Sequence, residues 1–416
     1  MLKLWNRFPL WQKVLAGFAL GVLAGVLLGE QADYLKPLGD AFIRLIKMLV
    51  VPLIFCAIVM AVTSMHDGAK LKRLGLKTIG LFLTTALIAS VLGILVGNLF
   101  DFGFTEQLVK GEATQKVIPS VSQVFLEMIP VNPIAAMAEG KILQLIVFAA
   151  FVGVAINVVG EKAEGLKKAI HGGAEVMFQI TRYVIQLTPI GVFGLMAWVV
   201  GAYGLSALLP LAKFVAAIYL ACLFHIIVVY GGLVKLAGFS PIKFFKAVFP
   251  AQLVAFTTAS SYGTLPVTTK VVTENLGVSP KYASFSLPLG ATINMDGCGG
   301  IYPAISAIFI AHIYGVPLEL LDYVLIALTA TLASVGTAGV PGTAMVMLTV
   351  TLNAVGLPLE GIAYIAAIDR VLDMMRTATN VTGDMMVSLV VGKSEGLQEG
   401  EILTNGDAEP AESQAS

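Results

Sequence analysis

Five polar residues near the C-terminal end of the chain recur at the spacing of one helical face. Asp369, Asp373, Arg376, Asn380 and Asp384 follow one another in steps of four, three, four and four residues, which places them on one side of a helix. The flanking segments, GLPLEGIAYIAAI before and MMVSLVVG after, are apolar enough for a membrane. Charges in a spanning helix are costly and normally face a cavity or a substrate pathway. The stripe therefore predicts a binding site rather than a solvated amphipathic helix near the surface.

The side chains of this stripe favour a zwitterion that carries an additional carboxylate. The guanidinium of Arg376 is a planar fork suited to a carboxylate, and Asp373, one turn earlier, can bind an ammonium group. An alternative is a structural ion pair between Arg376 and Asp373 or Asp369, and the two arrangements can alternate between transport steps. Hydroxyls of Ser260 and Ser261 are further candidates for substrate contacts.

Carboxylate and amide oxygens also occur in a pattern that suits a small hard cation. Asp384, Asn380, Asn294 and Asp296 supply oxygen ligands, and broken helices expose carbonyl groups. We expect Na⁺ as the coupling ion and no other cofactor. A proton relay through the same aspartates is the competing hypothesis.

The composition indicates a polytopic membrane protein. Of the 416 residues, 57% are hydrophobic and only 12% charged, and the mean hydropathy is +0.88, whereas soluble domains carry about a quarter charged residues. The formal net charge of zero argues against nucleic acid as a partner. Three cysteines and four histidines show no metal spacing, and no soluble catalytic motif is present. An intramembrane aspartyl protease would require YD and GxGD motifs, whereas the aspartates here occur as MDG and TGD.

Eight segments are long and apolar enough to be predicted as spanning helices, and Lys/Arg clusters orient them. The segments are 12–29, 42–65, 77–100, 142–160, 175–202, 207–236, 281–313 and 360–392. The basic clusters are Lys3 with Arg7; Lys70, Lys72, Arg73 and Lys77; Lys162, Lys167 and Lys168; and Lys235, Lys243 and Lys246. With the N-terminus inside, every cluster lies in the cytoplasm. No clear cleavage site follows MLKLWNRF, so we interpret the next apolar segment as the first spanning helix. We expect the protein in the plasma (inner) membrane, with both termini in the cytoplasm.

Two further apolar segments predict re-entrant helical hairpins. Residues 244–272 and 320–355 are each interrupted by Gly, Ser, Thr and Pro, and each half is too short to span. Each is followed by a helix with a polar interruption, NMDG at 294–297 and NVTGD at 380–384. This repeated unit indicates an inverted repeat, whose corresponding interruptions mark a transporter's binding site. The alternative is two unrelated loops. The polar segment 393–416 is expected to be a disordered cytoplasmic tail.

Four motifs in order resemble the glutamate transporter family, the dicarboxylate/amino acid:cation symporters. They are FTTASSYGTLPVT (256–268), LPLGATINMDG (287–297), ASVGTAGVPG (333–342) and DRVLDMMRTATNVTGD (369–384). IRLIKMLVVPLIF (43–55), IPVNPIAAMAEG (129–140) and LTPIGVFGLMA (187–197) are similar to its scaffold segments. The resemblance covers about residues 8–393.

This resemblance implies a homotrimer with an elevator mechanism. Scaffold helices would occupy 1–76 and 121–205, and the transport domain would comprise 77–120 and 206–392, before the tail at 393–416. The second hairpin would be the extracellular gate. An uncoupled anion conductance is a further alternative, because animal relatives combine it with transport.

Residue roles follow from the same resemblance. Arg376 matches the residue that binds the side-chain carboxylate, and Asp373 the one that binds the amino group. The further substrate contacts would be Thr377, Asn380, Ser261, and the tip residues Val340, Pro341 and Gly342. Asp384 with Asn294 and Asn380 matches one sodium site, and Gly290 is a further predicted sodium ligand. Ser334, Val335 and Thr337 match a second sodium site, and Thr85, Asn294 and Asp296 part of a third.

Departures from the patterns of particular family members reduce the number of candidate substrates. Asp384 stands where proton-coupled relatives tend to carry Asn, Asp373 where C4-dicarboxylate carriers have a small residue, and Arg376 where carriers of neutral amino acids lose it. These residues favour sodium-coupled import of L-aspartate or L-glutamate. Against this, Cys298 replaces the usual Thr beside the side-chain pocket, and GGIYPAI (299–305) is similar to cystine-transporting relatives. A cystine symporter and a proton-coupled glutamate or dicarboxylate symporter are therefore the alternatives.

Two departures concern other positions. Phe82 and Ala86 replace the Tyr and the Ser/Thr of the third sodium site, which is expected to be weakened. Ala259 and Met374 stand where relatives place an arginine, and we expect Arg370 to serve instead.

Overall fold

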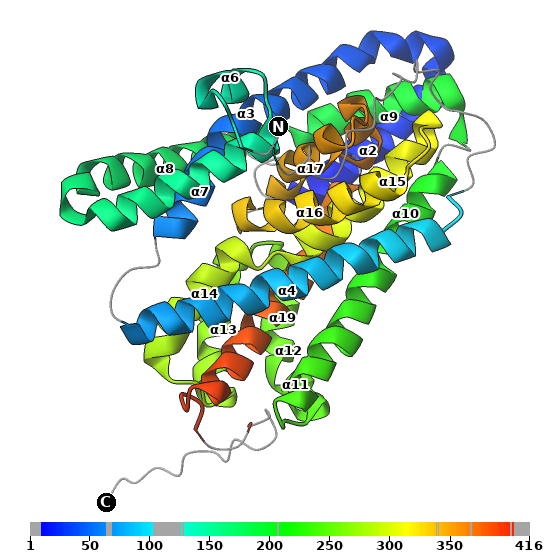
Figure 1. Ribbon diagram of the computed structural model, residues 1–416. Helices are drawn as coiled ribbons and strands as arrows, with labels where there is room; N and C mark the ends of the chain where they lie inside the picture. Colours follow the sequence, from blue (N-terminus) through cyan, green and yellow to red (C-terminus); the bar gives the residue numbers. More distant parts are fainter. Residues whose placement is uncertain are drawn as a thin grey trace, which may run out of the picture.

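Helices make up the secondary structure in the part of the chain that the computed structural model describes (Figure 1). The described residues are 10–63, 69–102, 126, 129–205, 208–337, 339, 341–366, 368–399 and 402. Helices satisfy every backbone hydrogen bond within one segment, which lipid requires. Among these residues, five helical segments have the length and apolarity to cross a membrane: Gln12–Phe42, Arg73–Leu99, Gln144–Val184, Leu208–Leu236 and Pro280–Tyr314. Lys3 and Arg7 lie outside the described residues.

One group of packed helices comes mainly from the N-terminal half. Its elements are α2 (Leu10–Leu28), η1 (Gly29–Leu35), α3 (Lys36–Thr63), α6 (Pro133–Ala138), α7 (Ile142–Val159), η2 (Gly160–Ala163), α8 (Glu164–Gln186) and α9 (Thr188–Tyr203). Helix α3 packs against α7, α8 and α9, and Figure 1 shows α7 and α8 side by side along it. The predicted helix 175–202 is interrupted between α8 and α9, because Pro189 in the first turn of α9 cannot donate a backbone hydrogen bond.

Glycines set the close contact between α2 and α9. A Cβ added to Gly17, Gly21 or Gly25 would lie 2.3, 2.6 or 2.7 Å from a carbonyl oxygen of α9. These glycines are spaced by four residues and therefore form one face of α2. Small residues at this spacing allow two helix backbones to approach within a membrane.

The second group of packed helices surrounds α19 (Asp369–Ser394). Its other elements are α4 (Ala69–Leu99), α10 (Leu208–Phe224), η4 (His225–Tyr230), α11 (Gly231–Leu236), α12 (Pro241–Thr258), α13 (Ser261–Lys270), η5 (Val271–Asn275), α14 (Pro280–Ile293), η6 (Asp296–Ile301), α15 (Tyr302–Tyr314), α16 (Leu320–Gly336), α17 (Thr343–Ala354), η7 (Leu359–Gly361) and α18 (Ile362–Ala366). The predicted helix 281–313 is interrupted at Asn294 and Met295, and the predicted helix 360–392 is divided into η7, α18 and α19. Helix α19 is buried along most of its length (Figure 1).

The two predicted hairpins are present as helix pairs whose tips touch. Helices α12 and α13 are joined at Ala259, which adopts a left-handed conformation (φ 49°), and Ser260 caps α13 by accepting a hydrogen bond from the amide of Gly263 at 3.0 Å. Helix α17 begins after Gly342, which also has a positive φ. The carbonyl of Gly339 accepts bonds from the Tyr262 amide at 3.1 Å and the Ser260 hydroxyl at 3.0 Å. The hairpin tips therefore hold each other directly.

The chain beyond Lys393 begins as ordered structure. Helix α19 continues to Ser394, and Glu395 forms ion pairs with Arg73 and with Lys77 (2.5 Å) of α4. The amide of Ser279 donates to the carbonyl of Leu397 at 2.7 Å. These contacts are made by the first residues of the segment 393–416, whose disorder stays a prediction. Residues 400–401 and 403–416 lie outside the described residues.

Candidate functional site

The polar stripe predicted from the sequence lies on α19 and is buried. Asp369, Asp373, Arg376, Asn380 and Asp384 all belong to this helix, and their exposed fractions are 0–3%. An ionised group at this depth requires partners, because an unpaired buried charge is strongly destabilising. The neighbouring elements supply those partners.

Arg376 is held by two carboxylates and one aromatic ring. Its Nη2 lies 2.8 Å from Oδ1 of Asp369 and 3.3 Å from Oδ1 of Asp373. The guanidinium carbon lies 3.9 Å from the ring centroid of Tyr302, a cation–π contact. Among the described residues, Nε and Nη1 of Arg376 and the hydroxyl of Tyr302 have no hydrogen-bond partner. The structural ion pair is thus formed, and it leaves two guanidinium donors for another acceptor.

Asp373 is the point at which the predicted substrate residues converge. Its Oδ2 accepts from the amide of Gly342 at 3.2 Å, and its Oδ1 lies 3.7 Å from the thiol sulfur of Cys298 and 3.4 Å from the hydroxyl of Thr377. The second hairpin tip and the helix interruption after Asn294 therefore meet at one carboxylate. Arg370 also approaches it, with Nη1 4.0 Å from Oδ2.

The first hairpin tip reaches this centre through Arg370. Nη2 of Arg370 donates a hydrogen bond to the carbonyl of Thr258 at 3.1 Å. Ser261 is buried at the tip, whereas the Ser260 hydroxyl is engaged in capping α13 and bonding Gly339. Pro341 is half-buried, and Val340 lies outside the described residues.

The residues predicted for one cation site are also brought together. Nδ2 of Asn294 donates to Oδ1 of Asp384 at 2.9 Å and to the carbonyl of Asn380 at 3.3 Å. A Cβ added to Gly290 would lie 2.5 Å from the same carboxylate oxygen, so this position requires glycine. The side chain of Asn380 points elsewhere, because its Oδ1 accepts from the amide of Gly297 at 2.8 Å. Oδ1 of Asn294 has no partner among the described residues.

The predicted second cation set lies where α16 meets the interruption of α14. The hydroxyl of Ser334 donates to the carbonyl of Ile293 at 2.7 Å and accepts from the amide of Met295 at 3.0 Å. Thr337 is buried and its hydroxyl donates within α16, while Val335 is half-buried. This hairpin end therefore stabilises the non-helical backbone at Asn294.

For the third predicted set, Thr85 and Asp296 make separate contacts. The Thr85 hydroxyl donates to the carbonyl of Phe82 in its own helix at 3.0 Å. Oδ2 of Asp296 accepts from the Tyr230 hydroxyl at 2.7 Å and lies 3.0 Å from Nε2 of His225. Oδ1 of Asp296 has no partner in the described part of the chain.

His225 and Tyr230 are site residues that the sequence reasoning missed. Both are fully buried and lie in or at the end of the π-helical turn η4. A histidine within a spanning segment is by itself a functional signal, but only the tertiary structure pairs it with Asp296. Tyr302 belongs to the GGIYPAI motif, but its stacking on Arg376 is visible only in the structure, where it follows the π-helical turn η6.

Residues 10–394 match the sodium:dicarboxylate symporter family. The chain belongs to this family. It is therefore a multi-pass membrane transporter and not an enzyme, and the buried charges of α19 lie in a transport protein. The family assignment includes nearly all of the described residues, so both helix groups are part of one family fold.

Several curated relatives are similar over nearly the whole length. The chain is 36% identical over 399 residues to a proton/sodium-glutamate symport protein of Geobacillus stearothermophilus, covering 93% of this chain and 94% of the relative. It is 36% identical over 410 residues to a proton/glutamate-aspartate symporter of Escherichia coli, covering 94% and 93%. It is also 34% identical over 395 residues to a C4-dicarboxylate transport protein of Janthinobacterium, covering 92% and 89%. The relatives thus include carriers named for amino acids and for dicarboxylates.

Proposed function

We propose that this protein is a sodium-coupled symporter that imports an acidic amino acid, L-aspartate or L-glutamate. The observation that carries the proposal is the buried pair of Asp373 and Arg376, a negative and a positive anchor 3.3 Å apart with two guanidinium donors left over. The names of the glutamate and glutamate-aspartate relatives agree with this substrate class.

In the proposed binding mode, the substrate replaces contacts that the protein makes with itself. The side-chain carboxylate would accept from Nε and Nη1 of Arg376, while Asp369 keeps Nη2. The ammonium group would bind Asp373, which now accepts from the amide of Gly342 at the second hairpin tip. Binding would therefore rearrange that tip, as expected of a gate. Ser261, Thr377 and Asn380 are the candidates for the remaining polar contacts.

Sodium would bind beside Asp384, Asn294 and the Asn380 carbonyl. The unpartnered Oδ1 of Asn294 and the carboxylate of Asp384 are hard oxygen donors of the kind such a cation needs. Asn380 belongs to the sodium site and to the substrate site. Its carbonyl accepts a hydrogen bond from Asn294, and its side chain accepts one from the amide of Gly297, next to Cys298. A cation that orders this interruption would also order the substrate pocket. Coupling of this kind is reciprocal, so the substrate would raise the affinity for sodium as well.

For the architecture, we propose eight spanning helices and two re-entrant hairpins, with both termini in the cytoplasm of the inner-membrane protein. The helix group of α2, α3, α7, α8 and α9 would be the scaffold of a homotrimer. The group around α19 would be the transport domain, moving as an elevator. The support is that each group packs mainly within itself, together with the cytoplasmic placement of the Lys/Arg clusters.

Cystine is the second candidate substrate, and it rests on Cys298. This buried thiol contacts Asp373, so it would line the pocket for the substrate side chain. A polarizable sulfur beside the substrate suits a disulfide better than a threonine hydroxyl would.

A thermal-shift series on the purified protein separates these candidates. L-aspartate, L-glutamate, L-cystine and succinate would each be added with and without sodium. We expect stabilisation by aspartate or glutamate only when sodium is present. Stabilisation by cystine alone would transfer the assignment to the second candidate. Sodium-independent stabilisation by glutamate would contradict sodium coupling and favour protons.

A further inference from the structure

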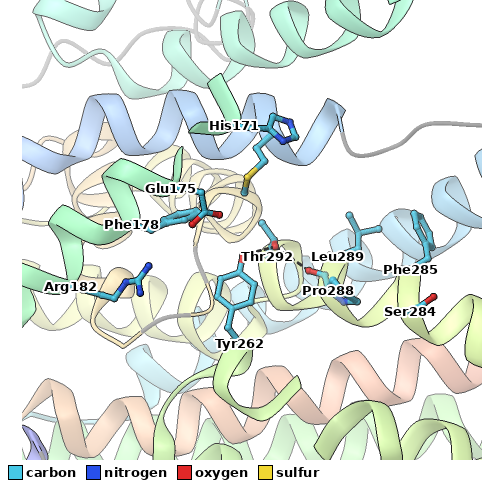
Figure 2. Close-up of a pocket in the computed structure, with 11 residues that line it drawn as sticks. His171, Glu175, Phe178, Arg182, Tyr262, Ser284, Phe285, Pro288, Leu289 and Thr292 are labelled. Carbon is cyan, nitrogen blue, oxygen red and sulfur yellow. Dashed lines mark hydrogen bonds between the residues drawn. The ribbon is translucent and has the colours of Figure 1, made fainter. Parts of the chain in front are cut away.

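A cavity of about 570 Å³ lies between the two helix groups, beside the tip of the first hairpin. One wall comes from α3 and α8, and the other from α13 and α14 (Figure 2). Each wall contributes apolar side chains, Met60 and Phe178 on one side and Phe285 and Leu289 on the other. None of the residues of the α19 site lines it, so the cavity is separate from the proposed substrate site.

Helix α8 presents both a cation and an anion to this cavity. Glu175 and Arg182 are seven residues apart, which puts them on one face of α8 about 10 Å apart along its axis. Figure 2 shows the carboxylate and the guanidinium both directed toward the side on which Tyr262 and Thr292 lie. Within the described part of the chain the two form no ion pair with each other, and both are exposed.

The remaining polar groups of the cavity are already engaged. Tyr262 and Thr292 share a hydrogen bond of 2.9 Å between their hydroxyls, and His171 lies 2.7 Å from the hydroxyl of Thr63. Glu175 and Arg182 are thus the charged pair available to a ligand. Their long side chains can converge on a molecule that carries an ammonium and a carboxylate.

We propose that this cavity is a second, weaker site for the acidic amino acid that the protein transports. Arg182 would bind a carboxylate and Glu175 the ammonium group, repeating the pair of anchors formed by Arg376 and Asp373. The inference rests on the proposed function, because it names the same substrate. The volume exceeds what an aspartate molecule needs, and such an excess agrees with a loose, hydrated and weak site.

The position of the site gives it a consequence for transport. A ligand there contacts α3 and α8 on one side and α13 and α14 on the other, so it bridges two groups that must slide in the proposed elevator. It also contacts Tyr262, whose amide joins the two hairpin tips. The positive-inside rule places the Lys167 and Lys168 end of α8 in the cytoplasm. Accumulated substrate would therefore slow its own further uptake.

Equilibrium binding of radiolabelled L-aspartate to the full chain in phosphatidylcholine nanodiscs, with sodium present, tests the inference. We expect two classes of site in the wild type. Arg376→Lys, which keeps the charge of the buried ion pairs, should weaken the tight class by about 10-fold to 150-fold and leave the weak one unchanged. Arg182→Gln should weaken the weak class by about tenfold or more and leave the tight one unchanged, and that unchanged tight class shows that the variant folds. Glu175→Gln should act in the same direction.

Other outcomes are decisive as well. A single class in the wild type that Arg376→Lys weakens would overturn the second site and leave the proposed function standing. Absence of any aspartate binding to the wild type would contradict the proposed function itself. A phospholipid that remains bound to the wild type but not to Arg182→Gln in native mass spectrometry would assign the cavity to lipid and overturn the inference.

Discussion

Replacing Arg376 by lysine keeps a positive charge in the site but removes the planar fork. In the structure, Nη2 of Arg376 contacts Asp369 at 2.8 Å and Asp373 at 3.3 Å, and Nε and Nη1 are the donors left for a substrate carboxylate. An ammonium group satisfies the two aspartates as a point charge, but it cannot hold a carboxylate in a bidentate pair as well. Alanine would be a poorer test, because two buried carboxylates would lose their cation, at a cost of about 3–5 kcal/mol in stability.

The expected loss can be estimated from these contacts. A hydrogen bond to a charged group contributes about 1.5–3 kcal/mol, and lysine forfeits at least one of the two bonds that Nε and Nη1 would make. At about 1.4 kcal/mol for each factor of ten, the affinity for L-aspartate should fall about 10-fold to 150-fold. Fold stability should change little by comparison, since the charge balance of α19 is preserved.

Isothermal titration of L-aspartate in the presence of sodium measures this loss directly. Arg73→Lys on α4 is a matched control, because it makes the same exchange at the ion pair with Glu395, which lies about 33 Å from Asp373 along α19 at the helical rise per residue. The control should bind aspartate like the wild type. If Arg376→Lys retained aspartate affinity within about threefold of the wild type, the guanidinium fork would not be the carboxylate anchor, and the substrate assignment would fail.

Three further predictions concern the cation sites and the end of α19. Asp384→Asn removes the carboxylate that Asn294 contacts, so the sodium concentration for half-maximal aspartate binding should rise by about tenfold or more; an unchanged sodium titration would contradict the assignment. His225→Gln retains an N–H donor for Asp296 and should preserve sodium affinity, whereas His225→Ala should lower it about fivefold, and equal effects of the two would argue against a positioning role. The hydrogen bond from Lys77, aided by Arg73, lowers the pKa of Glu395 below its usual range. Its ion pairs therefore stabilise the fold above the ordinary carboxyl pKa and lose that effect as the pH falls through the lowered value. Glu395→Gln should lower the melting temperature at about pH 7, and that difference should shrink as the pH falls through the lowered pKa of Glu395; a difference that persists in acid would refute the linkage.

Helical periodicity and turn residues were enough to predict the local elements and to propose the site residues. The spacing of Asp369 to Asp384 is a property of helical periodicity, so the structure has these residues on one buried helix. The hairpins were predictable because Gly, Ser, Thr and Pro interrupt apolar segments too short to span, and the helix pairs end at those residues. The requirement for glycine at position 290, by contrast, is visible only in three dimensions, because Asp384 occupies the space that a side chain would need.

How these elements meet is visible only in three dimensions, because periodicity describes single segments and not the contacts between them. Residues far apart in the chain pair through packing, and examples are the contact of His225 with Asp296 and the bond of Gly342 to Asp373. The π-helical turns η4 and η6 change which side chains face the centre, and no propensity distinguishes them from ordinary helix. The cavity beside Tyr262 exists only because helices from two groups approach without filling the space between them. Local hydrogen bonding and hydropathy fix what each segment is, whereas the contacts between segments depend on the whole set of side chains packing at once.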